Sequence, residues 1–371
     1  MSEPKKFSPF TIGLAFFAMF FGSGNLVFPL FLGQYAGDHW FTVFLGFLLS
    51  GVIGPLFGVV AMVAYQGNTN KFFETIGKRN ALIFVSLLMM VWIPFGAAPR
   101  CIRVAYESFA TAVPTVPLWI FGIVYSALVY FSIVRKSRMI EVLGYFLTPA
   151  LLICLAVLWV LGMLGTEAPP TSIESTASIF HTGLAHGYET MDLIASFFFS
   201  LSIIAVIQAE KMPVGQSMKK ALLSGFIGMS ILAMVYLALI YMAARNADLL
   251  APLAKDQLLP FISRQFLGPQ WSIIPVGVVF LACLTTSVAM LSVFADFVKE
   301  KYLPWDETSS YSVIIGVVLT YFLSLFTFDG LMVVTTPILE ISCPLLILLT
   351  VYNLGKKFFF ESSNGAPQVE N

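Results

Sequence analysis

Long uncharged apolar stretches recur along almost the whole chain, and they limit its possible folds more than any other feature. A helix needs about 20 apolar residues to cross a bilayer, whereas the strands of a membrane barrel alternate over about ten residues. Only 11% of the residues are charged, against roughly 25% in soluble domains. The sequence therefore predicts an all-α polytopic membrane protein with about ten transmembrane helices, at 10–32, 41–65, 81–111, 115–134, 139–164, 188–209, 221–244, 272–298, 311–328 and 330–354.

Lysine and arginine are distributed unevenly between the predicted loops. They recur at both chain ends and after every second helix, whereas the opposite loops contain only Arg245, Lys255 and Arg264. Loops rich in positive charge remain in the cytoplasm. We therefore expect both termini in the cytoplasm, with residues 356–371 as a cytoplasmic tail and the long loops 165–187 and 245–271 outside.

The stretch FFGSGNLVFPLFLG, which begins at Phe20, interrupts the first predicted helix. Glycine costs about 1 kcal/mol relative to alanine inside a helix, and proline about 3 kcal/mol. Irregular backbone at membrane depth is tolerated only where it is buried in protein or lines a cavity. Close helix packing could also use glycines, but here Gly22, Ser23, Gly24 and Asn25 are consecutive. This favours a functional break, whose free N–H groups suit a carboxylate and whose carbonyls suit a small cation.

Two later helices could complete such a site. If the chain consists of two inverted five-helix units, helix 188–209 corresponds to the first helix; it contains serines around Phe197–Phe199 but no central glycine. Serines in membrane helices often bond only to their own helix, so a break there stays open. The eighth helix contains the adjacent hydroxyls of Thr285, Thr286 and Ser287. Interhelical hydrogen bonds would explain them, but beside a broken first helix they favour a hard-cation site.

Three motifs resemble signatures of a known family. FFGSGNLVFPLFLGQYAG, AAPRCIRVAYESF and GYETMDLIASFFFS are similar to the first, third and sixth helices of the branched-chain amino acid:cation symporter (LIVCS) family, in the amino acid–polyamine–organocation superfamily. The resemblance covers nearly the whole chain. It implies a fold like that of the bacterial leucine transporter, a 5+5 inverted repeat with discontinuous helices 1 and 6. The two repeats would comprise residues 1–164 and 165–355, and the protein would lie in the bacterial cytoplasmic (inner) membrane.

The resemblance also implies positions for the ligands. The coupling cation would contact the carbonyls of Ala18, Phe21 and Ala282 and the hydroxyls of Thr285 and Thr286. The substrate carboxylate would meet the N–H groups around Ser23 and Gly24, and further substrate contacts would come from Gly22, Asn25, Phe199 and Ser202.

The chain departs from the family pattern in several places. Phe199 is followed by Ser200 where the family has Phe-Gly at the helix 6 break, and Cys101 replaces a threonine. Most members have about twelve helices, whereas ten are predicted here. A second Na⁺ in this fold would use Asn25 with an asparagine from helix 7, and none occurs between Ala221 and Ala244. We therefore expect at most one Na⁺.

Charged residues inside predicted membrane helices require a partner or a function. Arg103 and Glu107 are spaced to form a pair. Arg100, Asp192 and Glu340 are candidate gating or proton-carrying residues. Glu340 is the only carboxylate that we expect to be buried in the second half of the fold, and it would favour H⁺; the hydroxyl pair favours Na⁺. His186 falls in a predicted external loop and is interpreted as a surface residue.

These patterns predict a secondary active transporter that imports leucine, isoleucine, valine or methionine with a cation, with Na⁺ favoured over H⁺. A membrane enzyme would need catalytic groups such as HExxH or paired intramembrane aspartates, and the sequence has neither. An amino-acid-sensing receptor without net transport stays open as the alternative. Beyond the coupling ion we expect no cofactor, and beyond substrate and lipid no nucleic acid and no obligate protein partner.

Overall fold

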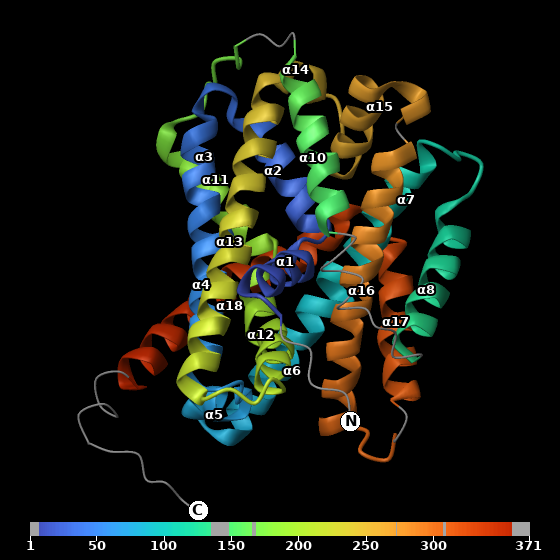
Figure 1. Ribbon diagram of the computed structural model, residues 1–371. Coiled ribbons are helices and arrows are strands. Elements are labelled where there is room, and N and C mark those ends of the chain that lie inside the picture. Colours follow the sequence, from blue (N-terminus) through green and yellow to red (C-terminus); the bar gives the residue numbers. More distant parts are fainter. Residues whose placement is uncertain (1–6, 135–147, 165–167, 272, 307–308, 358–371) are drawn as a thin grey trace, which may run out of the picture.

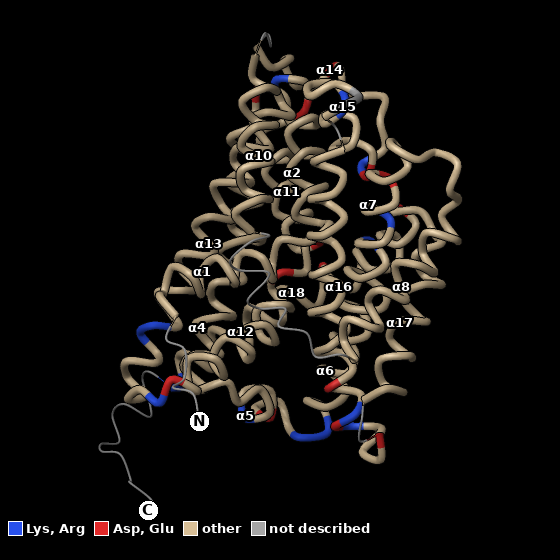
Figure 2. The backbone as a smooth tube through the Cα atoms, turned by 45° about the vertical axis from the view of Figure 1, so that its right-hand side comes forward, with Lys and Arg blue, Asp and Glu red and all other residues tan. Residues whose placement is uncertain are grey.

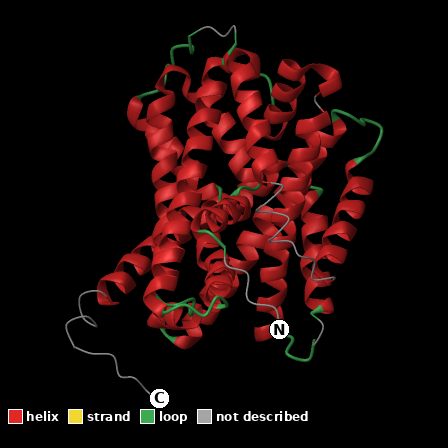
Figure 3. Ribbon diagram, viewed as in Figure 1, coloured by secondary structure: helices red, strands yellow, loops and turns green. Residues whose placement is uncertain are grey.

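The computed structural model describes residues 7–134, 148–164, 168–271, 273–306 and 309–357 of the 371-residue chain. This part of the chain is helical and contains no strand (Figure 1; Figure 3). Six of its continuous helical segments are long and apolar enough to cross a membrane, and four more apolar helices are shorter.

The predicted first unit is made of helices that are mostly interrupted. In chain order these are α1 (Pro9–Phe20), α2 (Ser23–Ala36), α3 (Trp40–Leu48), the π-helix η2 (Leu49–Ile53), α4 (Gly54–Ala64), α6 (Lys78–Trp92), the π-helix η4 (Ile93–Ala97), α7 (Ala98–Ala110), α8 (Leu118–Val134) and α10 (Thr148–Met163). Short helices join them, namely η1 (Gly37–His39), α5 (Thr69–Phe73) and η3 (Glu74–Ile76).

The predicted second unit begins with another broken helix. It consists of α11 (Thr176–Glu189), α12 (Asp192–Gln208), α13 (Val214–Arg245), α16 (Ile273–Lys301), α17 (Ser310–Ser324) and α18 (Phe328–Gly355). Between α13 and α16 lie α14 (Ala247–Leu250), η6 (Lys255–Gln257) and α15 (Leu258–Trp271). Most predicted spans agree with these helices within a few residues; 139–147 of the fifth span and 358–371 of the predicted tail lie outside the described residues.

The core forms where helices from the two halves of the chain pack together. α1 and α2 pack on α13, α3 packs on α11, α4 on α12 and α7 on α16. The backbones of α3 and α11 approach closely, because a Cβ atom on Gly46 would lie 2.2 Å from the Phe180 carbonyl oxygen. Small residues allow such contacts between membrane helices. In the resulting assembly α1 and α12 lie in the middle of the fold, whereas α11 lies at its side next to α3 (Figure 1).

Charge and apolar surface are separated as a membrane protein requires. Lysines and arginines gather at the end of the molecule where α5 and α6 lie, and the middle of the helices is almost free of them (Figure 2). Large apolar side chains such as Ile123, Val124 and Phe131 of α8 and Phe322 of α17 are exposed on the sides. These sides face the lipid in a membrane-spanning protein.

Candidate functional site

The first helix is broken at the place predicted from the sequence. α1 ends at Phe20, α2 begins at Ser23, and Gly22 between them has an extended backbone. The side chain of Asn25 folds back over the start of α2, where its Oδ1 accepts a hydrogen bond from the Gly22 N–H at 3.1 Å. The first N–H groups of a helix and the last carbonyls of another lack partners within their helices. The break therefore offers donors for an anion and acceptors for a cation.

The sixth helix is broken as well, between α11 and α12. α11 ends at Glu189, and Met191 adopts the left-handed conformation with φ +64°. The Thr190 hydroxyl donates to the Gly187 carbonyl at 2.8 Å and so closes the end of α11. Asp192 is the first residue of α12, where a carboxylate is favoured by the helix dipole.

The break in helix 6 lies at Met191, eight residues before Phe199, beside which the sequence predicted it. The span was predicted at 188–209 with its weak point beside Phe199, but α12 continues through this region and the Ser200 hydroxyl donates to the Ser196 carbonyl at 2.5 Å. Part of the predicted external loop 165–187 is the helix α11. The prediction was wrong here because it looked for glycine, whereas a left-handed methionine makes the turn.

The two breaks meet in the buried core. A Cβ atom on Gly24 would lie 3.4 Å from the Thr190 Cα, so the backbones of the two breaks are separated by little more than the space of one methyl group. Asn25 Nδ2 donates to Asp192 Oδ2 at 2.6 Å and is also bonded to the Tyr236 hydroxyl. That hydroxyl donates to the same Asp192 oxygen at 3.1 Å. α2, α12 and α13 are thus joined by one polar network, and no sequence pattern indicated that Tyr236 takes part in it.

The Thr286 hydroxyl of α16 lies against the end of the first half-helix. The Thr286 hydroxyl donates to the Phe21 carbonyl at 3.5 Å, and the Thr285 hydroxyl lies 2.9 Å from the Ala282 carbonyl oxygen. Ala18 lies in the last turn of α1, three residues before Phe21, and is half-buried. The structure therefore places Thr286 next to Phe21, whereas the Thr285 hydroxyl bonds within α16, to the carbonyls of Leu281 at 2.8 Å and Ala282 at 2.9 Å. These donors are neutral oxygens, and their chemistry fits a hard monovalent cation.

Phe199 lies among aromatic rings below the break. Its ring contacts those of Phe20 at 5.7 Å and Trp92 at 5.3 Å between centroids, and its side chain is buried. Cys101 of α7 is also buried and donates to the Ser23 hydroxyl oxygen at 3.5 Å. Aromatic and small apolar groups therefore surround the first break on the sides of α6, α7 and α12.

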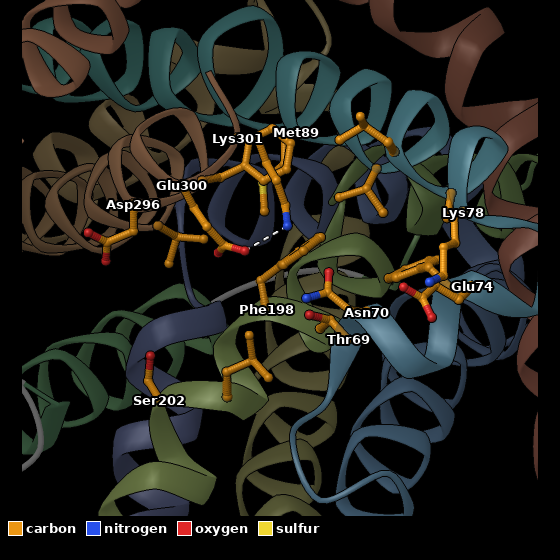
Figure 4. Close-up of a pocket in the computed structure, with 17 residues that line it drawn as sticks. Thr69, Asn70, Glu74, Lys78, Met89, Phe198, Ser202, Asp296, Glu300 and Lys301 are labelled. Atoms are coloured by element: carbon orange, nitrogen blue, oxygen red, sulfur yellow. Dashed lines mark hydrogen bonds and ion pairs between the residues drawn. The ribbon is translucent and has the colours of Figure 1, made fainter. Parts of the chain in front are cut away.

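Ser202 lies one turn further along α12 and lines a cavity of about 480 Å³. The cavity is formed by α5, α6, α12 and α16, at the end of the molecule that carries most lysines and arginines (Figure 2; Figure 4). Asn70, Met89, Phe198 and Asp296 are among its other lining residues. The described lining of the cavity contains no residue of α1 or α2, so Ser202 faces the basic end of the protein and not the first break.

Arg100 ties the third helix to the end of α11. Its side chain is 1% exposed, and its Nη1 donates to the Glu189 carbonyl at 2.9 Å. The guanidinium also lies 5.7 Å from the ring centre of Phe28 and 5.8 Å from that of Phe328. The π-helix η4 directly precedes the helix that carries Arg100, and such segments are frequent at functional sites. Arg100 therefore stabilises α2, α11 and α18 against each other on the far side of the breaks from the cavity.

His186 is part of the same contact region, which corrects its interpretation as a surface residue. His186 Nδ1 is bonded to Glu189 Oε2, and its ring stacks on Phe28 at 5.5 Å. The other carboxylate oxygen of Glu189 accepts a hydrogen bond from the Thr336 hydroxyl at 2.7 Å. These side chains close the fold above the breaks, and a single sequence contains no pattern that pairs them.

Glu340 is not buried. It lies on the exposed face of α18, together with Val333 and Ile341. In the second half of the described chain the carboxylate at the meeting point of the broken helices belongs to Asp192, which is 3% exposed. The predicted pair between Arg103 and Glu107 is confirmed at 3.0 Å.

Comparison with known proteins agrees with this architecture. The sequence profile of the branched-chain amino acid transport protein family matches residues 5–368. The chain belongs to this family. The branched-chain amino acid permease BrnQ of Bacillus subtilis is 32% identical over 367 residues, covering 94% of this chain and 79% of that protein. The branched-chain amino acid transport system 2 carrier protein of Pseudomonas aeruginosa is 30% identical over 357 residues, with the same coverage.

Solved transporter structures share the fold. The inward-facing conformation of Mhp1 matches with a TM-score of 0.66 and 15% identity, over 95% of this chain and 78% of that one. MhsT in complex with L-phenylalanine matches with a TM-score of 0.64 and 15% identity, over 100% of this chain and 94% of that one. The prediction of a leucine-transporter-like helical fold with discontinuous helices 1 and 6 is confirmed. The relatives are transport proteins, as the sequence predicted, rather than enzymes.

Proposed function

We propose that the protein is a secondary active transporter that imports branched-chain or similar apolar amino acids together with a cation, with Na⁺ favoured over H⁺. The observation that carries this proposal is the contact between the two broken helices beside the Thr286–Phe21 pair. The relatives are permeases and carriers of branched-chain amino acids, as their names state.

The residues of the first break have defined parts in the proposed mechanism. The N–H groups of Ser23 and Gly24 bind the substrate carboxylate, because they stand at the positive end of the α2 dipole. The side chain of the substrate packs against Phe199 and neighbouring rings, where it displaces water from an apolar surface. A hydrophobic pocket of this kind distinguishes substrates that differ by one methylene only weakly, by about 1–3 kcal/mol.

The cation binds to the oxygens of Phe21, Ala282, Thr285 and Thr286, with Ala18 completing the set. The 3.5 Å between Thr286 Oγ1 and the Phe21 oxygen is long for a hydrogen bond, so the two oxygens hold each other only weakly and an ion could bind to both. Because Phe21 stands at the end of a broken helix, a cation here would stabilise one arrangement of α1 against α16.

The distribution of charge supports an orientation. The cavity that Ser202 lines opens at the end rich in lysine and arginine, which we assign to the cytoplasm by the positive-inside rule. The Arg100–Glu189 contact then closes the external side. In this orientation both termini are cytoplasmic, the protein lies in the bacterial inner membrane, and the cavity is the path by which substrate leaves toward the cytoplasm.

Counterflow in proteoliposomes tests this function against a receptor on the same fold. Vesicles loaded with unlabelled leucine should take up labelled leucine, and isoleucine, valine and methionine should compete. Binding of labelled leucine by the purified protein without counterflow would contradict transport and support the receptor.

A further inference from the structure

Asp192 is a buried carboxylate whose hydrogen bonds come from neutral groups alone. Its side chain is held by Asn25 and Tyr236, which both donate to Oδ2. The second oxygen, Oδ1, accepts no hydrogen bond from the described residues. The Thr190 hydroxyl lies beside this carboxylate, but its proton is directed to the Gly187 carbonyl oxygen at 2.8 Å. One carboxylate oxygen therefore has unused acceptor capacity in a residue that is only 3% exposed.

No charged group of the described residues forms an ion pair with this carboxylate. Among the described residues, no lysine, arginine or histidine nitrogen lies within 4 Å of it. Arg100 of α7 attracts the Asp192 carboxylate through space, but its hydrogen bonds go to the backbone carbonyls of Gly96 and Glu189 and not to Asp192. His186 of α11 is bonded to the Glu189 side chain. A buried carboxylate that is not paired with a positive charge is costly, so the site is suited to a cation from outside the protein.

We propose that Asp192 accepts the α-ammonium group of the transported amino acid through Oδ1, and thereby restricts the substrate to molecules with a free ammonium group. This inference rests on the proposed function and names the feature of the substrate that its site recognises. The ammonium ion and the carboxylate form an ion pair, and no proton is transferred and no covalent bond changes.

The geometry of an amino acid fits this arrangement. Its carboxylate and ammonium groups are separated by one carbon atom, so their binding groups must lie close together. The Asn25 side chain provides this proximity, since it is bonded both to the Gly22 N–H at the start of α2 and to the Asp192 carboxylate. When the carboxylate of the substrate binds at the first turn of α2, its ammonium group therefore lies next to Asp192 of α12. Tyr236 and Asn25 hold Asp192 in place for this contact, as positioning residues.

A matched pair of ligands tests the assignment. L-leucine and 2-hydroxy-4-methylpentanoate have the same carbon skeleton and carboxylate, but the second carries a hydroxyl in place of the ammonium group. Affinities of both are measured by displacement of labelled leucine from the purified protein, or by thermal stabilisation where labelled leucine binds too weakly. The variants are Asp192→Asn and, as a control, Asp256→Asn, which changes another buried carboxylate that pairs with Arg103 away from the breaks.

We expect the wild type to bind leucine about 100-fold or more tightly than the hydroxy acid. The hydroxy acid has no ammonium group, so it would leave the buried Asp192 carboxylate without its partner. Asp192→Asn should reduce the preference to within about threefold by weakening leucine alone, whereas Asp256→Asn should retain it. Equal affinities of the wild type for the two ligands would overturn the proposal without any variant. An unchanged preference of Asp192→Asn for leucine over the hydroxy acid would also overturn it. If this variant differs from the wild type only in the Na⁺ concentration that it requires, Asp192 acts on the coupling ion instead. Absence of leucine binding to the wild type would refute the proposed function itself.

Discussion

Replacement of Thr286 by alanine should weaken the binding of the coupling ion without removing the break in the first helix. The Thr286 hydroxyl is 3.5 Å from the Phe21 carbonyl oxygen, so the substitution deletes one of the two oxygens that join α16 to α1. A hydrogen bond or contact to a charged group contributes about 1.5–3 kcal/mol. The Na⁺ concentration for half-maximal leucine uptake should therefore rise by roughly 10- to 150-fold, because each 1.4 kcal/mol is a factor of ten.

The assay is the initial rate of labelled leucine uptake into proteoliposomes at increasing external Na⁺. Thr286→Ser keeps the hydroxyl and should stay within a few-fold of the wild type. Thr350→Ala is the control for loss of a buried threonine, since that hydroxyl is bonded to the Leu346 carbonyl of its own helix. Glu340→Gln should leave the Na⁺ dependence nearly intact, because Glu340 is exposed on α18.

The sodium assignment would be refuted by a specific pattern of results. If uptake ignores Na⁺, follows an imposed pH gradient, survives Thr286→Ala and is lost in Glu340→Gln, the coupling ion is a proton. Glu340 would then be the coupling residue despite its position on the outer face of α18.

Three further predictions use other parts of the structure. Gly24→Leu should abolish thermal stabilisation by leucine, because a Cβ atom there would already lie 3.1 Å from the Phe28 ring and 3.4 Å from the Thr190 Cα; normal stabilisation would show that Gly24 is remote from the ligand. Isoleucine, valine and methionine should compete with leucine for uptake within about 200-fold of one another, whereas effective competition by lysine or glutamate would exclude an apolar site. Gly33→Val should lower the melting temperature, because its Cβ atom would lie 2.1 Å from the Ile240 carbonyl oxygen and overpacking typically costs about 1–3 kcal/mol. Gly277→Ala should leave the melting temperature unchanged, because its Cβ atom would meet no heavy atom within 4 Å. Equal melting temperatures of the two variants would contradict the packing of α2 on α13.

Local signals in the sequence predicted the first break, because glycines and asparagine weaken a helix wherever they occur. The same rule failed at helix 6, where Met191 makes the turn in a left-handed conformation. A better signal was present in the order of Thr190 and Asp192. A threonine can close one helix through its hydroxyl, and an aspartate favours the start of the next. Two polar residues separated by one position inside an apolar stretch would have indicated the break.

Contacts between distant segments could not be predicted from one sequence. Asn25 and Asp192 are 167 residues apart, and Asn25 and Tyr236 are 211 residues apart. Tyr236 lies in an apolar helix whose sequence shows nothing unusual at this position. The same limit explains the misplacement of Glu340, because hydropathy identifies a membrane helix but does not determine which of its faces is covered by neighbouring helices.

The most direct measurement of the central claim is leucine accumulation in proteoliposomes under ion gradients imposed one at a time. With an inward Na⁺ gradient and equal pH on both sides, labelled leucine should rise inside above its external concentration and fall back when the gradient is dissipated. An inward H⁺ gradient in Na⁺-free buffer should produce no such accumulation. Accumulation driven by the pH gradient alone would contradict Na⁺ coupling, and equilibration to the external concentration under both gradients would contradict symport.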